Sequence, residues 1–147
     1  MQLKKQILIA GLLALEGARA ELEECGLDRN RGAGVHACRA ASVQLRSCRL
    51  TGNAGQGLSA VDAAALVLKD CDLQGNAGPG VLLHRGGSAR LDRCAITAGK
   101  AQGIECRQGA ALALEGCRIQ GNALGGILVA QDALPPGLGP GNQIQLT

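Results

Sequence analysis

The stretch AALVLKDCDLQGNAGPGVLLHRG, residues Ala64 to Gly86, decides the fold, because its pattern recurs every 23 residues along the chain. Its cysteine belongs to a column of five: Cys25, Cys48, Cys71, Cys94 and Cys117. Each of these cysteines has a Leu three places before it, a Leu or Ile two places after it and a Gly nine places after it. A step this regular indicates similar structural units stacked one on another.

Apolar residues alternate with other residues in three short pieces of this unit: Leu66 with Leu68, Cys71 with Leu73, and Val81 with Leu83. A period of two over short runs that end at Gly or Asn predicts β-strands. We expect each strand to pair in parallel with the same strand of the next unit. The predicted fold is therefore an all-β, right-handed parallel β-helix solenoid of about five to six 23-residue coils, with three short strands per coil.

The repeat also predicts how the chain is divided. We expect residues 1–147 to form a single β-helix domain, in which residues 1–10 form a strand that leads into the array and residues 11–134 form the repeat coils. Pro135 and Pro136 fall where a strand should begin, and proline cannot donate to a strand ladder. Residues 135–147 are therefore predicted to be an irregular C-terminal end, with a possible last strand at Ile144 and Leu146.

Two inward columns are predicted to act as structural ladders. The cysteines named above form one, and we interpret them as reduced, small hydrophobic core residues. The second column contains Asn30, Asn53, Asn76 and Asn122, with Gly99 in the fourth coil. Asn and Gly tolerate the left-handed backbone region, and stacked Asn amides can hydrogen-bond from coil to coil.

Composition narrows the classes of function. The net charge is +3, the charges form no runs, and the chain has no aromatic residue on which a base could stack, so no nucleic-acid partner is expected. The apolar run from Ile7 to Leu15 is too short to span a bilayer as a helix, so no membrane partner is expected. Free cysteines favour a reducing, cytoplasmic location. The alternative is a secreted or periplasmic protein, if residues 1–20 are a cleaved signal that ends at Ala18-Arg19-Ala20.

A second repeat fold competes for this pattern. The string L-x-x-C-x-L-x-x-N, as in Leu22 to Asn30, also fits a leucine-rich repeat. That repeat needs an apolar residue two places after the Asn, and the column there is mainly small: Gly32, Gly55, Gly78, Ala101 and Leu124. The column pattern therefore favours the β-helix.

The units GNAGPGVLLHRGGSARLDRCAI (Gly75 to Ile96) and GNALGGILVAQDA (Gly121 to Ala133) resemble the right-handed β-helix repeats of pectate-lyase-like proteins. They are similar in particular to the repeats of carbohydrate-binding and sugar-hydrolase domains and of some F-box proteins. The resemblance covers residues 11–134. It implies the fold, but it leaves the function open, because the group contains polysaccharide lyases, epimerases, glycosidases, phage tailspikes and non-catalytic binding modules.

Enzymes of this group, by the same resemblance, use clustered carboxylates for Ca²⁺ and a basic residue near the sugar. Among the outward columns that we inspected, only Asp92 over Glu115 stacks two acids on adjacent coils. An exposed pair of this kind is ordinary surface charge. We therefore expect no catalytic residues, no metal site and no cofactor, and the prediction leans against an enzyme.

One outward strip remains as a candidate binding surface. The positions eleven and thirteen places after the cysteines should point outward on one strand of each coil. The strip is centred on His36, Leu82, His84, Glu105, Arg107 and Leu128. The alternative is an ordinary variable surface. His36 with Cys38 does not provide a zinc site, because two more ligands are lacking.

Three functional hypotheses follow from these observations. The first is a non-catalytic β-helix scaffold that binds a partner, a protein in the first instance, through a flat outer sheet, either by itself or as part of a larger protein. The second is a carbohydrate-binding or polysaccharide-acting module of the pectate-lyase-like group. The third is a leucine-rich-repeat interaction domain. End-to-end or side-by-side oligomers are also compatible with the repeat.

Overall fold

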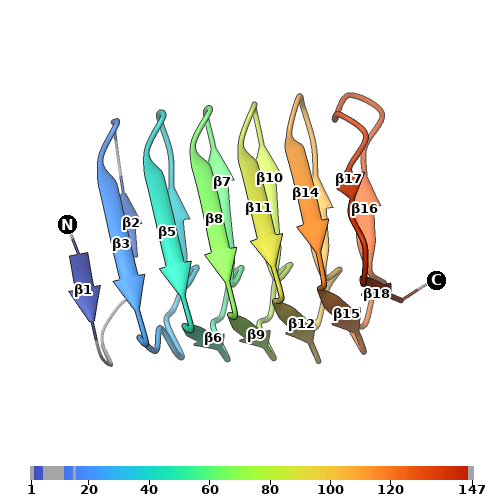
Figure 1. The fold of residues 1–147 in the computed structure, drawn as a ribbon, viewed down its shortest axis with the longest axis horizontal. Helices are drawn as coiled ribbons and strands as arrows, with labels where there is room; N and C mark the ends of the chain where they lie inside the picture. The colour runs from blue at the N-terminus through green and yellow to red at the C-terminus, as the bar shows by residue number, and fades with distance from the viewer. Residues whose placement is uncertain (1, 5–11, 15, 146–147) are drawn as a thin grey trace.

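The computed structural model describes residues 2–4, 12–14 and 16–145, and it is a solenoid of three parallel sheets (Figure 1). Each coil of about 23 residues contributes one strand to each sheet, and there are about five coils. The described termini lie at opposite ends of the solenoid axis. Every strand pair is parallel, so each residue lies beside its equivalent on the next coil.

Sheet A contains the five-residue strands and is formed by β1 (Gln2–Lys4), β3 (Arg19–Glu23), β5 (Ser42–Arg46), β8 (Ala65–Lys69), β11 (Ser88–Asp92), β14 (Ala111–Glu115) and β17 (Gly137–Leu138). Sheet B is formed by β2 (Leu12–Ala14), β4 (Val35–Ala37), β7 (Leu58–Val61), β10 (Val81–His84), β13 (Ile104–Cys106) and β16 (Ile127–Val129). Sheet C is formed by β6 (Arg49–Thr51), β9 (Asp72–Gln74), β12 (Ala95–Thr97), β15 (Arg118–Gln120) and β18 (Gln143–Ile144). Sheets A and B face each other, and sheet C closes the coil.

This arrangement confirms the predicted all-β parallel solenoid with three strands per coil. The leucine-rich-repeat alternative is wrong, because the second half of each described unit forms strands of sheets B and A rather than a helix. The search for membrane-spanning helices found none with the necessary length and apolar character in the described residues.

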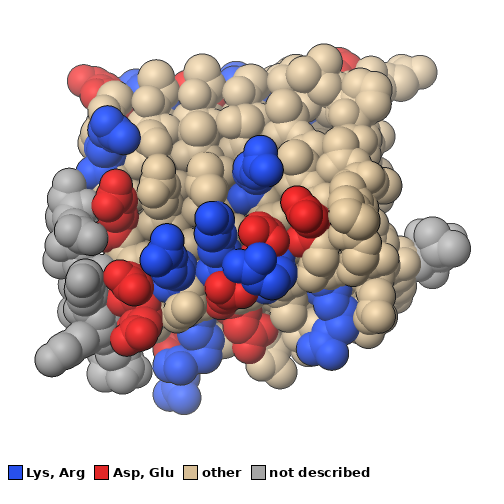
Figure 2. Space-filling model, viewed as in Figure 1, with Lys and Arg blue, Asp and Glu red and all other residues tan. Residues whose placement is uncertain are grey.

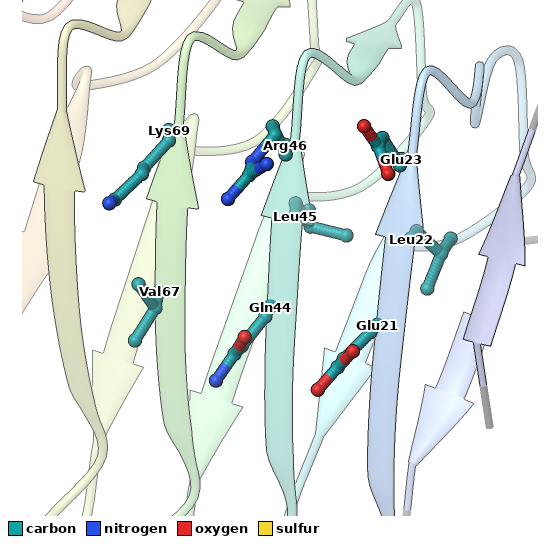
Figure 3. A pocket seen from close by; sticks show the side chains of 8 residues that line it. All are labelled: Glu21, Leu22, Glu23, Gln44, Leu45, Arg46, Val67 and Lys69. Atoms are coloured by element: carbon teal, nitrogen blue, oxygen red, sulfur yellow. The ribbon is translucent and has the colours of Figure 1, made fainter.

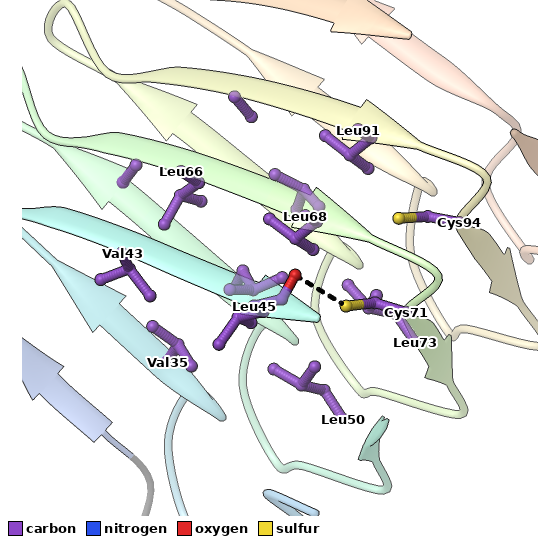
Figure 4. Packing of buried hydrophobic residues seen from close by; sticks show 14 of the residues in the cluster. Val35, Val43, Leu45, Leu50, Leu66, Leu68, Cys71, Leu73, Leu91 and Cys94 are labelled. Carbon is purple, nitrogen blue, oxygen red and sulfur yellow. Dashed lines mark hydrogen bonds between the residues drawn. The ribbon is translucent and has the colours of Figure 1, made fainter. Parts of the chain in front are cut away.

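The core is a set of aliphatic columns inside the three sheets (Figure 4). In β8, Leu66 and Leu68 are buried while their neighbours along the strand point outward. The cysteine column is also buried and unbridged. The Cys71 thiol donates a hydrogen bond of 3.5 Å to the Leu45 carbonyl of the preceding coil. Each buried Leu stabilises the fold by roughly 1.5–3 kcal/mol relative to an exposed one.

The asparagine column forms a buried hydrogen-bonded ladder. Asn30 donates from its side-chain amide to Asn53 Oδ1 at 2.8 Å, and Asn53 donates to Asn76 Oδ1 at 2.9 Å. Asn53 also donates to the carbonyl of Leu27 on the preceding coil at 3.1 Å. Among the described residues, every buried polar side-chain atom has a hydrogen-bond partner.

The sequence suggested that Asn occupies this column because it tolerates the left-handed backbone, and this explanation is wrong. The left-handed backbone belongs to the preceding column, with φ of 55° at Arg29, 62° at Gly52, 68° at Gly75, 55° at Ala98 and 67° at Gly121. The turn is therefore made one residue earlier than expected. The asparagines are placed to satisfy buried backbone and side-chain groups.

The glycine that precedes each sheet B strand is required by a close approach between coils. A Cβ on Gly57 would lie 2.6 Å from the Gly80 carbonyl oxygen, and a Cβ on Gly34 would lie 2.8 Å from the Gly57 carbonyl oxygen. Real Cβ atoms do not approach carbonyl oxygens this closely. These glycines therefore set the packing distance at the corner between sheets C and B.

The ends of the array depart from the repeat. Part of the strand expected in residues 1–10 is β1, and residues 5–11 lie outside the described residues. In the last coil, Leu114 pairs with Leu138 and Ile119 with Ile144, so the step exceeds 23 residues after the two prolines. The last predicted strand is β18 (Gln143–Ile144), while Leu146 lies outside the described residues. The division of residues 1–147 into these parts as one domain stays a prediction.

Candidate functional site

Charged side chains gather over the outer face of sheet A, which faces the viewer in Figure 2. Because side chains alternate along a strand, two outward rows cross this sheet from coil to coil. One row is Glu23, Arg46, Lys69, Asp92 and Glu115, and the other is Glu21, Gln44, Val67, Arg90 and Ala113. Both rows run along the solenoid axis.

Two depressions hollow this face. The first, of about 370 Å³, lies over β3, β5 and β8 (Figure 3). Its lining residues are Glu21, Leu22, Glu23, Gln44, Leu45, Arg46, Val67 and Lys69. The second, of about 200 Å³, lies over β11, β14 and β17 and is lined by Arg90, Asp92 and Glu115 among others. Since β8 pairs with β11, the depressions follow one another, and together they are called the sheet A channel.

The cations of the sheet A channel differ from five other arginines of the solenoid, which are held by carboxylates. Arg39, Arg49, Arg85, Arg93 and Arg107 each form an ion pair of 2.7–3.2 Å. Arg46, Lys69 and Arg90 are exposed, and none of them forms an ion pair with another described residue.

Asp70 lies at the edge of the sheet A channel. A hydrogen bond of 2.9 Å from Arg93 lowers the pKa of the Asp70 carboxyl, and the charges of Arg46 and Lys69 lower that pKa further. Asp70 is therefore paired with Arg93, and its charge also acts on the two cations of the channel.

The strip predicted from the sequence lies on sheet B, on the opposite outer face of the solenoid. Its first row, His36, Ser59, Leu82, Glu105 and Leu128, is continuous from coil to coil. His84 is beside Val61 on one neighbouring coil. Arg107, at the end of β13, donates its backbone N–H to the Leu83 carbonyl. The strip residues are therefore brought together on one face, while their role in binding stays a prediction.

Two features of the strip differ from the expectation. Cys38 and Ser59 were expected to point outward, and they are only 7% and 3% exposed. Glu105 and Arg107 form an ion pair of 3.0 Å, so the strip carries little unpaired charge. Leu82, His84 and Leu128 are half-buried and add apolar surface to it.

The buried thiols of Cys71 and Cys106 are poor nucleophiles in this fold. The hydrogen bond with the neighbouring Cys48 thiol, together with burial, raises the pKa of Cys71 to about 12. Burial, with a smaller contribution from Glu105, raises the pKa of Cys106 to about 11. Within the described part of the chain, His, Cys, Asp and Glu side chains form no cluster of three or more that could hold a metal ion.

The sequence analysis interpreted the row of Glu23, Arg46 and Lys69 as a solvated face and so missed the sheet A channel. The signal that could have found it is the pair of adjacent cations, Arg46 and Lys69, on consecutive coils, with Arg90 on the next. Their lack of pairing and the hollow beside them become visible only in three dimensions.

The family model for the right-handed β-helix region matches residues 7–134, and the chain belongs to that family. Among curated proteins, none matches the chain by sequence.

Among solved structures, the chain is similar to the crystal structure of the periplasmic alginate epimerase AlgG, with a TM-score of 0.80 and 12% identity over 99% of this chain and 38% of that one. A double mutant of the same epimerase matches with a TM-score of 0.75 and 11% identity, over 93% of this chain and 38% of that one. A single mutant matches with a TM-score of 0.66 and 12% identity, over 93% of this chain and 42% of that one. The chain thus spans less than half the length of these structures, and the likeness concerns the fold.

These comparisons correct the first functional hypothesis. The prediction of a non-catalytic scaffold for a protein partner is wrong, because the matching structures are those of an enzyme named for its action on alginate, a polysaccharide. The surface of the described residues also gives a physical reason against a protein partner. Protein interfaces are centred on apolar side chains, whereas the exposed large apolar side chains of the described residues all lie toward the C-terminal end: Leu124, Val129, Leu134 and Leu138.

Proposed function

We propose that this chain is a carbohydrate-binding or polysaccharide-acting module of the right-handed β-helix family. The observation that carries the proposal is the fold likeness to the alginate epimerase over nearly the whole of this chain. Because fold alone does not define function, the surface has to fit as well. The sheets extend along the axis for the length of the described array, and charged side chains gather on the outer face of sheet A.

The geometry of a solenoid suits a linear polymer. Neighbouring coils are separated by the strand spacing of about 4.8 Å, which is close to the length of one sugar residue in an extended chain. A polysaccharide that lies along the axis therefore meets equivalent positions on successive coils. We propose the strip on sheet B as its contact surface, with His36, Leu82, His84, Glu105, Arg107 and Leu128 as the contacting residues.

The chemistry of the strip fits the uncharged parts of a sugar. Leu82 and Leu128 offer apolar surface to C–H faces, while His84 and the paired Glu105 and Arg107 offer hydrogen-bond donors and acceptors to hydroxyl groups. Because Arg107 is already paired, the strip has little reason to distinguish a neutral sugar from an acidic one.

Calorimetric titration of the full chain with alginate, polygalacturonate and neutral dextran, with and without Ca²⁺, tests the proposal. We expect binding of at least one of these polymers, and weaker binding after the exchanges Arg107→Gln and His84→Ala. Arg118→Gln, on the outer face of sheet C, is the matched control and should leave the affinity unchanged. Failure of the wild-type chain to bind or modify any polysaccharide would refute the proposed function.

We also infer a periplasmic or secreted location, which the likeness to a periplasmic epimerase supports over the cytoplasmic one. The free cysteines do not oppose this location. Their thiols are buried, and the raised pKa values of Cys71 and Cys106 keep them out of the reactive thiolate form. Fractionation of the source cells tests the inference, which predicts the protein outside the cytoplasm. Recovery of the protein from the cytoplasm alone would contradict it.

A further inference from the structure

The sheet A channel carries a feature that the strip on sheet B lacks, namely a run of unpaired cations. Arg46, Lys69 and Arg90 lie on three successive strands, β5, β8 and β11. All three side chains are exposed, and none forms an ion pair with a described residue. In contrast, Arg107 on the strip and Arg93 at the edge of sheet A are both held by carboxylates.

Two of these cations lie beside each other in the free protein, with Glu23 on the other side of Arg46 and Asp92 on the other side of Lys69. Arg46 lies directly beside Lys69 in the parallel register, so two like charges are separated by about one strand spacing. Directly opposed like charges on neighbouring strands destabilise a sheet. In Figure 3 both side chains extend over the same depression, and no acidic side chain lies between them. An anion bound there would remove the repulsion.

The surroundings of the cations suit a sugar more than another anionic polymer. Gln44 and Glu21 border the same depression and offer an amide and a carboxylate to hydroxyl groups, while Val67 offers apolar surface to C–H groups. The two depressions of the channel follow one another along the axis, in the direction that a bound linear chain would take. Single-stranded nucleic acid is disfavoured, because its bases stack on aromatic side chains and this chain contains none.

Acidic residues mark the limits of this run. Glu21 and Glu23 precede it on β3, and Glu115 follows it on β14. Asp92 lies beside Lys69 on β11 and is held by Arg93 at 3.2 Å. The three unpaired cations therefore span three coils, which at one sugar per coil corresponds to a segment of about three residues.

We propose that the sheet A channel is a second binding site, specific for a sugar chain that carries carboxylates, and that Arg46, Lys69 and Arg90 each pair with one carboxylate of successive or nearby uronate residues. The inference rests on the proposed function and narrows it, because it names the class of sugar and a face of the solenoid distinct from the strip. Arginine and lysine bind carboxylates through charge-assisted hydrogen bonds, which are stronger than neutral ones.

A matched pair of probes and a matched pair of variants test the proposal. The probes are an oligogalacturonate and its fully methyl-esterified form, which has the same sugar backbone without the charge. The channel variant combines Arg46→Gln, Lys69→Gln and Arg90→Gln. The control variant combines Arg31→Gln, Lys100→Gln and Arg118→Gln, and it changes the net charge equally. These three exposed cations lie outside the channel and form no ion pair with a described residue. Circular dichroism verifies that both variants retain the β-helix.

We expect the channel variant to lose roughly tenfold in affinity for the charged oligomer, since three exposed ion pairs are removed. Its affinity for the methyl ester should not change, and the control variant should behave as the wild type. Raising the salt from about 50 to about 300 mM should weaken wild-type binding of the charged oligomer and should hardly affect the channel variant.

The inference fails while the proposed function stands if the wild type binds the oligogalacturonate and the channel and control variants lose affinity equally. The same conclusion follows if neither variant loses affinity. The inference is also overturned if single-stranded DNA, used as a competing anion, binds the channel more tightly than the oligomer does. The inference fails if the wild type binds neither the charged nor the esterified oligomer, and the proposed function fails with it only if alginate and dextran do not bind either. A loss of methyl-ester binding in a strip variant, with the channel variant unaffected, would support two separate sites.

Discussion

The inner and outer columns of the solenoid follow different rules. The asparagine column inside the fold repeats the same residue on four of five coils, and its members are 1–7% exposed. The outer row of sheet A instead changes from Glu23 to Arg46, Lys69 and Asp92 along successive coils. An inner residue has to fit its own copy above and below, whereas an outer residue meets water. Repetition therefore indicates the fold, and departures from repetition indicate where function has to be sought.

The largest expected effect comes from breaking an inner column at its most connected residue. Asn53→Ala removes an acceptor for the backbone and side chain of Asn30 and donors to Leu27 and Asn76. Each buried polar group left without a partner costs about 1–3 kcal/mol, so we expect a loss of about 3 kcal/mol or more. Urea unfolding measures it, with Gln74→Ala on the outer face of sheet C as the control. Equal stability of the two variants would contradict the importance of the ladder.

The second expected effect is alkaline sensitivity from the buried thiols. The pKa of Cys71 is raised from 9.0 to about 12 and that of Cys106 to about 11, so above pH 9 the unfolded chain loses protons that the folded chain keeps. Stability should therefore be constant below pH 9 with respect to these groups, and it should fall as the pH rises toward 11, by on the order of 2 kcal/mol for each of the two groups.

Unfolding measured at several pH values checks this fall. The double variant Cys71→Ala and Cys106→Ala should show a shallower dependence on pH, although it is less stable at pH 7. A dependence as steep as that of the wild type would show that other groups are responsible.

The third expected effect concerns the close approach between coils. Gly57→Ala would place its Cβ 2.6 Å from the Gly80 carbonyl oxygen, and the required shift should cost about 1–3 kcal/mol. Gly32→Ala is the matched control, because nothing lies within 4 Å of its Cβ position. Thermal unfolding should show a lower Tm for the first variant only. A similar Tm for both would mean that the corner is more adaptable than the packing indicates.

The smallest expected effect comes from a substitution that completes the asparagine column instead of breaking it. Gly99 interrupts the ladder, and its N–H already donates to Asn122 Oδ1 at 3.0 Å. Gly99→Asn would place an amide between Asn76 and Asn122 and should add about 1 kcal/mol of stability through new hydrogen bonds. Only the movable Asn122 Oδ1, at 2.9 Å, crowds the new Cβ. A destabilised variant, measured by urea unfolding, would show that the fourth coil cannot accept the ladder.

The sequence predicted the inner columns well because stacking repeats each inner residue at a fixed step. The 23-residue period, the three strands per coil and the buried Cys71 and Asn53 columns followed from residue spacing alone. It misplaced the left-handed turn by one residue, since both Gly and Asn tolerate that backbone and spacing cannot separate them. It also failed to anticipate the burial of Cys38, which lies just beyond the end of β4.

The outer faces were harder to predict because their residues do not repeat. The sequence predicted that His84 and Arg107 share a face, and the register of β10 and β13 brings them to neighbouring coils. The sheet A channel required knowledge of which cations lack a carboxylate partner, and ion pairs such as that of Arg85 with Asp62 depend on side-chain positions that a column pattern does not contain.

Backbone amide chemical shifts of the full chain, recorded while an oligogalacturonate is added, test most directly the claim that a sugar chain binds along the outer faces. The account predicts shifts that increase with added ligand in β5, β8 and β11 of sheet A and in β10 and β13 of sheet B, with little change in β6, β9, β12 and β15 of sheet C. Shifts confined to sheet C, or no shifts at saturating oligomer, would contradict it.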